Sequence, residues 1–292
     1  VDGLKQITWG LFAKIVVADE LAIYVDDIFS NVPDYSGSTL LVGILFFTIQ
    51  IYADFAGYSN MAIGTGKLFG FNIMRNFAYP YFARDISEFW KRWHISLTTW
   101  FRDYLFLPLA TAVSGRIGKE RFLGISKELI VFISASIVTW ILTGLWHGAG
   151  YNFIIWGLLH GILLILFYIQ RKPRKKLLKR IGVSKDNPAV AGAEYLLTFF
   201  LIMLAWVFFR AENLGSALEY LTGMFSPTLL SMPQVHPFPL IFIVFLFIMA
   251  EWIQRNSDHP LRMGNINNSI IRWSGYYLTV ILILFYAGGR QE

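Results

Sequence analysis

The stretch ELIVFISASIVTWILTGLWHGAGYNFIIWGLLHGILLILFYIQ, residues 128–170, decides the fold of this chain. It contains two largely apolar runs, 128–147 and 151–170, and about 20 such residues are what an α-helix needs to cross the hydrocarbon core of a bilayer. Glycines separate the two runs, so the stretch predicts two membrane-spanning helices joined by a short break. Two histidines, His147 and His160, lie in this apolar setting, where ionisable side chains are costly.

The composition of the 292 residues extends this prediction to the whole chain. Hydrophobic residues make up 55% and charged residues only 15%, against about 25% charged residues in ordinary globular domains. Further candidate spans are 39–64, 190–209, 238–254 and 270–287. Residues 6–24 are ambiguous between a span and an interfacial helix, because Lys14 and Asp19 interrupt them. We therefore expect an all-α, polytopic membrane protein with a single membrane-embedded domain over residues 1–292.

The net charge of +6 is local rather than general. The run RKPRKKLLKRIGVSK, residues 171–185, carries eight basic residues and no acid. A basic block directly after an apolar span is typical of a cytoplasmic anchor in contact with anionic lipid, and we favour this interpretation over a nucleic-acid surface. Basic loops at 65–127, 171–188 and 255–272 are predicted to be cytoplasmic, and the acidic segment 19–38 external.

The segment FARDISEFWKRWHISLTTWFRDYLFLPL, residues 82–109, is too aromatic for a solvated loop. Its helical spacing places one apolar stripe along one face, formed by Trp90, Trp93, Leu97, Trp100 and Tyr104. This pattern predicts an amphipathic helix that lies in the interface or re-enters the membrane. His94 falls at the border of the stripe, where it can face either a polar funnel or the lipid headgroups.

His147 is the last residue of its predicted span. Because an ionisable side chain at membrane depth is costly, His147 is a candidate functional residue. Burial favours the neutral imidazole, whose acceptor nitrogen can serve as a general base. A buried histidine that is hydrogen-bonded between helices fits equally well. The neighbouring glycines, at 144, 148 and 150, favour a bend at which His147 meets a cavity.

The other polar residues point to structural roles. His160 lies beside Gly157 and Gly161, a small-residue face that favours close helix packing. If both histidines were on one helix, His160 would lie about 20 Å from His147 along the axis, too far to share a metal ion. Asp54 lies within a span and is expected to face the bundle interior, paired with an arginine or another buried polar group.

Two further histidines, His236 and His259, each stand directly before a proline in a predicted loop. His236 and His259 are interpreted as solvated loop residues. The chain has no cysteine, which excludes disulfides and thiolate metal sites. We expect no bound metal and no bound cofactor. No signal-peptide pattern opens the chain, and its start at Val1 is expected to lie partway through a longer protein.

Several ordered motifs resemble one family. They are YADFAGYSN (52–60), WKRWHISL (90–97), TGLWHGAGYNFIIWGLLHG (143–161) and WVFFRAENLGSALEYLTGMF (206–225). These motifs are similar to those of the membrane-bound O-acyltransferase (MBOAT) family, most closely its bacterial alginate and polysaccharide O-acetyltransferase branch, over almost the whole chain. The resemblance implies a ring of membrane helices with re-entrant segments around a thin centre. It also implies that His147 is the catalytic residue and His94 a second functional one, but assigns no catalytic role to His160.

The resemblance further implies an activity. An enzyme of this kind moves a short acyl group, expected to be acetyl, from a cytoplasmic thioester such as acetyl-CoA to hydroxyls of a periplasmic or extracellular polysaccharide, directly or through a partner acetyltransferase. It would be a multi-pass protein of the bacterial inner membrane. Full members carry further helices before residue 1 and usually a segment after Glu292, so a fragment is expected.

Two alternatives stay open. D-alanyl transfer from a carrier protein to teichoic acid would use the same two histidines. A proton-coupled transporter or flippase would relay protons through Asp54 and His147. Many transporters show repeated halves, and the sequence shows no internal repeat.

Overall fold

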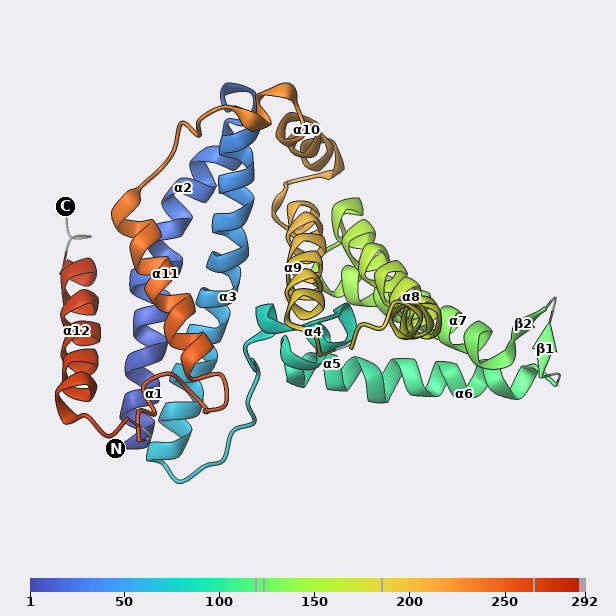
Figure 1. Cartoon of the computed structure of the whole chain (residues 1–292), viewed down its shortest axis with the longest axis horizontal. Helices are drawn as coiled ribbons and strands as arrows, with labels where there is room; N and C mark the ends of the chain where they lie inside the picture. Colours follow the sequence, from blue (N-terminus) through green and yellow to red (C-terminus); the bar gives the residue numbers. More distant parts are fainter. Residues whose placement is uncertain (119, 123, 185, 265, 289–292) are drawn as a thin grey trace. The chain divides into compact units, whose positions relative to one another are not determined.

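The computed structural model describes residues 1–118, 120–122, 124–184, 186–264 and 266–288 (Figure 1). The helices are α1 (Asp2–Leu11), α2 (Asp19–Ser30), α3 (Gly37–Leu68), α4 (Ile86–Arg92), α5 (Ile95–Phe101), α6 (Leu107–Arg116), α7 (Lys127–His147), α8 (Tyr151–Arg180), α9 (Pro188–Arg210), α10 (Leu214–Met224), α11 (Phe238–Ile253) and α12 (Ser269–Gly288). Short π or 3-10 segments are Phe12–Ala18, Val32–Asp34, Pro80–Phe82, Arg102–Phe106 and Pro227–Leu230. The strands β1 (Arg121–Phe122) and β2 (Ile125–Ser126) form an antiparallel hairpin. The all-α prediction is confirmed.

Among the described residues, five helices are long and apolar enough to cross a membrane: α3, α7, α8, α9 and α12. They correspond to five of the six predicted spans, and the chain is a multi-pass membrane protein. The sixth, α11, is equally apolar but has only 16 residues. At about 1.5 Å per residue it extends about 24 Å, less than the roughly 30 Å of a hydrocarbon core. The apolar helix predicted at 238–254 is therefore present, but it is shorter than the five helices that can cross a membrane.

The described chain divides into two compact units, and unit 1 comprises residues 1–79 and 219 onward. Its first helix is continuous from α1 through the π-helical segment into α2, and it packs along α3 (Figure 1). The contact is close, because a Cβ atom built on Gly10 would lie 2.6 Å from the carbonyl oxygen of Gly57. Trp9, Val16 and Leu21 are buried on this helix. The ambiguous segment 6–24 is thus a packed helix.

Asp54 has a different partner from the arginine suggested by the sequence. Lys14, in the π-helical segment, places its Nζ 2.5 Å from Asp54 Oδ1 and 2.9 Å from Asp19 Oδ1. The Asp54 side chain is 49% exposed, so the expectation that it faces the interior is also wrong. The pairing itself follows from the cost of leaving a charge unpaired at membrane depth.

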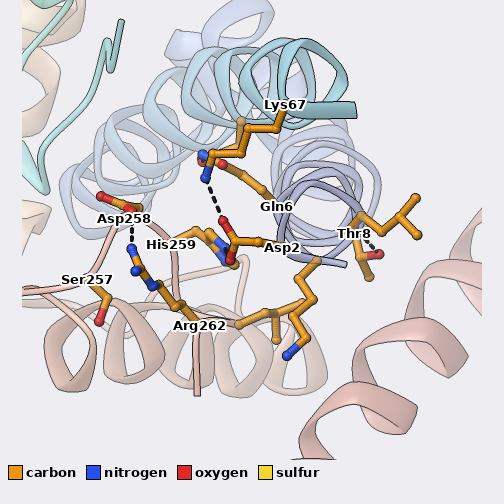
Figure 2. Close-up of polar contacts among 12 residues, drawn as sticks. Asp2, Gln6, Thr8, Lys67, Ser257, Asp258, His259 and Arg262 are labelled. Atoms are coloured by element: carbon orange, nitrogen blue, oxygen red, sulfur yellow. Dashed lines mark hydrogen bonds and ion pairs between the residues drawn. The ribbon is translucent and has the colours of Figure 1, made fainter. Parts of the chain in front are cut away.

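A second polar cluster connects the two sequence segments of unit 1, residues 1–79 and 219 onward (Figure 2). Asp2 Oδ2 accepts a hydrogen bond from Lys67 Nζ at 2.7 Å, and Asp2 Oδ1 lies 3.1 Å from His259 Nε2. His259 is fully buried, so its interpretation as a solvated loop residue is wrong, because the loop folds back onto α1. His236, in contrast, is exposed as predicted.

This cluster predicts that unit 1 loses stability on acidification. The Lys67 ammonium lowers the pKa of Asp2 from 3.8 to about 2, and burial lowers the pKa of His259 below 6.5. In both cases the unfolded chain binds the proton more readily than the folded chain, so stability falls as the pH drops below 6.5 and falls further below 3.8. Thermal midpoints in detergent should decrease between pH 7 and pH 5. The decrease should be shallower in His259→Gln, and an identical slope in both proteins would contradict this assignment.

Unit 2, residues 80–218, is built around the pair α7 and α8, which lie side by side (Figure 1). The two helices approach closely at Gly157, because a Cβ atom built there would collide with the carbonyl oxygen of Trp140. Gly161 likewise lies against the Trp140 side chain. The small-residue face predicted around His160 is confirmed as a helix-packing surface.

The basic run is helical rather than a loop, because α8 continues through residues 171–180. Arg174 in this part of α8 forms an ion pair with Glu194 of α9. The same carboxylate accepts a hydrogen bond from Arg84 Nε at 2.5 Å, and the Glu194 side chain is only 12% exposed. The run therefore also attaches α8 to α9. Its last basic residue, Lys185, lies outside the described residues.

The prediction of one continuous amphipathic helix over 82–109 is wrong at two points, because α4 begins only at Ile86 and the helix breaks at His94. Between α4 and α5 the backbone of Trp93 is extended and His94 adopts a left-handed conformation, with φ 43° and ψ 55°. The break divides the aromatic stripe: Trp90 and Trp93 are buried, whereas Trp100 and Tyr104 are exposed. The two halves of the stripe therefore face different surroundings.

Candidate active site

The site is built in unit 2 around His147, the last residue of α7. Three aromatic rings contact its imidazole edge-to-face: Trp146 at 4.8 Å, Trp156 at 5.0 Å and Phe209 at 5.0 Å between ring centroids. These rings come from α7, α8 and α9. The imidazole is only partly buried. His147 is therefore held in an aromatic niche while part of it stays accessible.

Asn152 explains why α9 reaches this niche. It lies in the first turn of α8 and is almost fully buried. Its Nδ2 donates hydrogen bonds to the carbonyl oxygens of Phe208 at 3.3 Å and Ala211 at 2.9 Å. These carbonyls lie at the end of α9, where they have no partner within the helix. The amide thus fixes the end of α9 beside the start of α8, and Phe209 beside His147.

His94 lies at the break between α4 and α5, in a backbone region that residues other than glycine seldom occupy. Thr98 stabilises the break, because its hydroxyl donates to the Trp93 carbonyl at 3.1 Å and its N–H to the His94 carbonyl at 3.0 Å. The Nδ1 atom of His94 lies 3.4 Å from the hydroxyl oxygen of Ser96. Burial lowers the pKa of His94, which keeps the ring neutral at neutral pH.

The two histidines predicted to be functional contact the same indole. The Trp146 ring lies 6.4 Å from His94 and 4.8 Å from His147, edge-to-face with both. They are separated by 53 positions in the sequence, and the fold of unit 2 brings them together. Their catalytic roles stay predictions.

His160 lies closer to His147 than the estimate of about 20 Å implied. That estimate assumed one continuous helix, whereas the chain reverses at residues 148–150 between α7 and α8. As a result the Trp156 ring contacts both imidazoles, at 5.0 Å from His147 and 4.9 Å from His160. His160 itself is fully buried, and its Nδ1 accepts a hydrogen bond from Trp90 Nε1 at 3.3 Å.

Sequence reasoning missed several residues of the site. Asn152 and Trp156 precede His160, which the sequence had already indicated, by eight and four residues. All three therefore lie along one face of α8, and this spacing was visible in the sequence. Phe209 carried no comparable signal.

In unit 1, the buried Glu251 accepts a hydrogen bond from Tyr52 at 2.9 Å. A single acid within the apolar run of α11 was a signal for this pair.

Within the described ranges, no three His, Asp or Glu side chains come together in a way that could hold an ion. The chemistry available at the site is that of imidazole nitrogens in an aromatic surrounding.

Comparisons with known proteins give these residues a context. The model of the MBOAT, membrane-bound O-acyltransferase family, matches residues 3–177. The probable alginate O-acetylase AlgI of Pseudomonas syringae pv. tomato is 38% identical over 225 residues, 77% of this chain and 39% of that protein. The peptidoglycan O-acetyltransferase of Helicobacter pylori is 40% identical over 222 residues, 76% of this chain and 38% of that protein. The teichoic acid D-alanyltransferase of Bacillus subtilis is 29% identical over 177 residues, 60% of this chain and 42% of that protein. The chain spans less than half the length of these relatives.

Proposed function

Because the chain belongs to the membrane-bound O-acyltransferase family, we propose that it transfers an acetyl group from a cytoplasmic thioester, acetyl-CoA, to hydroxyls of a cell-envelope polysaccharide. It would act in the bacterial inner membrane. The acceptor hydroxyl belongs either to the sugar or to a partner acetyltransferase that later acylates the sugar.

The observation that carries this proposal is the niche of His147. A general base must keep an acceptor nitrogen and must be reachable by the reacting hydroxyl. His147 is partly exposed, and three aromatic rings restrict its orientation. With the loop 65–127 predicted to be cytoplasmic, His147 ends the span α7 on the external side, where the hydroxyl of an envelope acceptor can reach it.

The chemical step conserves protons. The acceptor hydroxyl gives its proton to a ring nitrogen of His147 while its oxygen attacks the carbonyl carbon of the thioester. The tetrahedral intermediate collapses with cleavage of the C–S bond. The departing thiolate takes the proton from the imidazolium, which returns His147 to its neutral form. No metal or bound cofactor enters this step.

His94 is assigned a positioning role. It contacts the indole of Trp146, which also contacts His147, and its neutral ring can hydrogen-bond a polar group of the donor or the acceptor.

D-alanyl transfer to teichoic acid is the second candidate, supported by the similarity to the B. subtilis D-alanyltransferase. O-acetyl transfer is favoured because the proteins named for O-acetylation are more similar, at 38% and 40% identity, and match a larger share of the chain. Membership of an acyltransferase family also favours an enzyme over the transporter considered from Asp54 and His147.

The test is mass spectrometry of envelope polysaccharides from cells with the intact gene and from cells with the gene deleted. We expect O-acetyl groups on one polymer to disappear on deletion and to return on complementation. Loss of D-alanyl esters instead would select the second candidate. Unchanged acyl content of all polymers would contradict both.

A further inference from the structure

His160 is the point at which four helices of unit 2 meet. Tryptophans from α4, α7, α8 and α9 surround its ring: Trp90 at 4.9 Å, Trp140 at 5.4 Å, Trp156 at 4.9 Å and Trp206 at 6.3 Å between centroids. The side chain has no exposed surface. A polar ring in such a position costs stability unless its hydrogen bonds compensate.

One hydrogen bond determines the form of this imidazole. An indole Nε1–H can only donate, so Nδ1 of His160, 3.3 Å from Trp90 Nε1, must carry a lone pair. A neutral imidazole whose Nδ1 is unprotonated bears its proton on Nε2. The lone pair of His160 Nδ1, the acceptor nitrogen of the ring, is therefore already used by the hydrogen bond from Trp90.

Trp156 connects His160 to the candidate catalytic residue. Its ring meets His160 at an interplanar angle of 73° and His147 at 82°, so each imidazole is set against this one indole. Trp90, which His160 holds by the hydrogen bond, also contacts Trp156 at 5.9 Å. Trp90 and His160 therefore both pack against the ring that contacts His147.

We propose that His160 is a positioning residue for the acyl-transfer reaction: its Nδ1 bond to Trp90 and its contact with Trp156 hold the indole that orients His147. This inference rests on the proposed function. A displacement of about 1 Å in a catalytic group can lower a rate about 10²-fold, so the effect is expected in kcat and not in donor binding.

Two substitutions of similar polarity distinguish the role of Nδ1 from that of Nε2 in the His160 ring. His160→Asn offers an amide oxygen near the position of Nδ1 and can still accept from Trp90. His160→Gln extends its amide toward the position of Nε2 and loses that acceptor. In membranes containing the intact protein, we expect His160→Gln to lower kcat at least about tenfold with KM for the acyl donor within about twofold, and His160→Asn to keep at least about a third of the activity.

Trp90→Phe provides an independent variant, because it keeps a ring but removes the donor. Its kcat should fall as in His160→Gln, and the double variant should be no slower than either single variant, since both remove one bond. Trp273→Phe, at an exposed tryptophan of unit 1, is the matched control and should leave the rate unchanged. Rates are expressed per mole of protein that elutes as a monodisperse peak after detergent extraction of the same membranes, which removes any loss caused by misfolding.

Wild-type kcat in His160→Gln or in Trp90→Phe would overturn the positioning role. So would equal losses in His160→Asn and His160→Gln, or losses that multiply in the double variant. The proposed function fails separately: if membranes with the wild-type protein transfer no acyl group, the acyl-transfer assignment falls, and if His147→Ala is fully active, the role of His147 as the base falls. If His147→Ala is inactive and His160→Gln is not impaired, only the role of His160 falls.

Discussion

Replacement of His147 with alanine is expected to lower polymer acetylation about 10²–10⁴-fold, the range that a lost general base removes. Alanine leaves the hydroxyl without a proton acceptor, so the tetrahedral intermediate forms only from a rare alkoxide. Glutamine should be equally inactive, because an amide does not accept the proton. The acetyl content of the polymer, measured by mass spectrometry in complemented deletion cells, checks both variants.

The control for this prediction is His236→Ala. His236 is exposed in the loop before α11, and its Nδ1 lies 3.2 Å from the Pro233 carbonyl. Its removal should leave acetylation unchanged. Equal amounts of all variants in the membrane fraction show that lost activity is not lost protein. Wild-type acetylation in His147→Ala at equal protein amount would rule out His147 as the base.

The second large effect is expected at Gly157, where a methyl group should force α7 and α8 apart. A Cβ atom there collides with main chain, the carbonyl oxygen of Trp140, which cannot turn away as a side chain can. Overpacking of this kind costs about 1–3 kcal/mol. Gly157→Ala should therefore lower the thermal midpoint in detergent and the amount of protein in the membrane.

Gly192 of α9 is the matched control, because a Cβ atom built there meets no atom within 4 Å. In an unobstructed helix, alanine is favoured over glycine by up to about 1 kcal/mol. Gly192→Ala should then be neutral or slightly stabilising, opposite in sign to Gly157→Ala. If both substitutions shift the midpoint equally, close contact at Gly157 does not support the helix pair.

Much of the fold follows from hydropathy, because a spanning helix needs only a long enough apolar run. The two runs in residues 128–170 correspond to α7 and most of α8. Hydropathy alone misjudged α11, because its helix coincides with the apolar run but has only 16 residues. Helical periodicity also missed the break at His94, because the aromatic spacing continues through it while the hydrogen bonds of Thr98 end one helix and begin the next.

The candidate site was predictable in its residues but not in its geometry. The glycine break and the family motif indicate His147 and His94 from the sequence. That both contact Trp146, and that Trp156 lies against both His147 and His160, depends on how α4, α7 and α8 pack. Such contacts join residues far apart in the chain, and a one-dimensional pattern does not encode them. His259 was misjudged for the same reason, because α1 buries it.

The most direct test of the central claim is transfer of radiolabelled acetyl from acetyl-CoA to endogenous polymer in isolated membranes, compared between the wild-type protein and His147→Gln at equal protein amount. We predict that label enters the polymer with the wild-type protein and that His147→Gln reduces the initial rate at least about 100-fold. Label incorporation by His147→Gln within about twofold of the wild-type rate would contradict it.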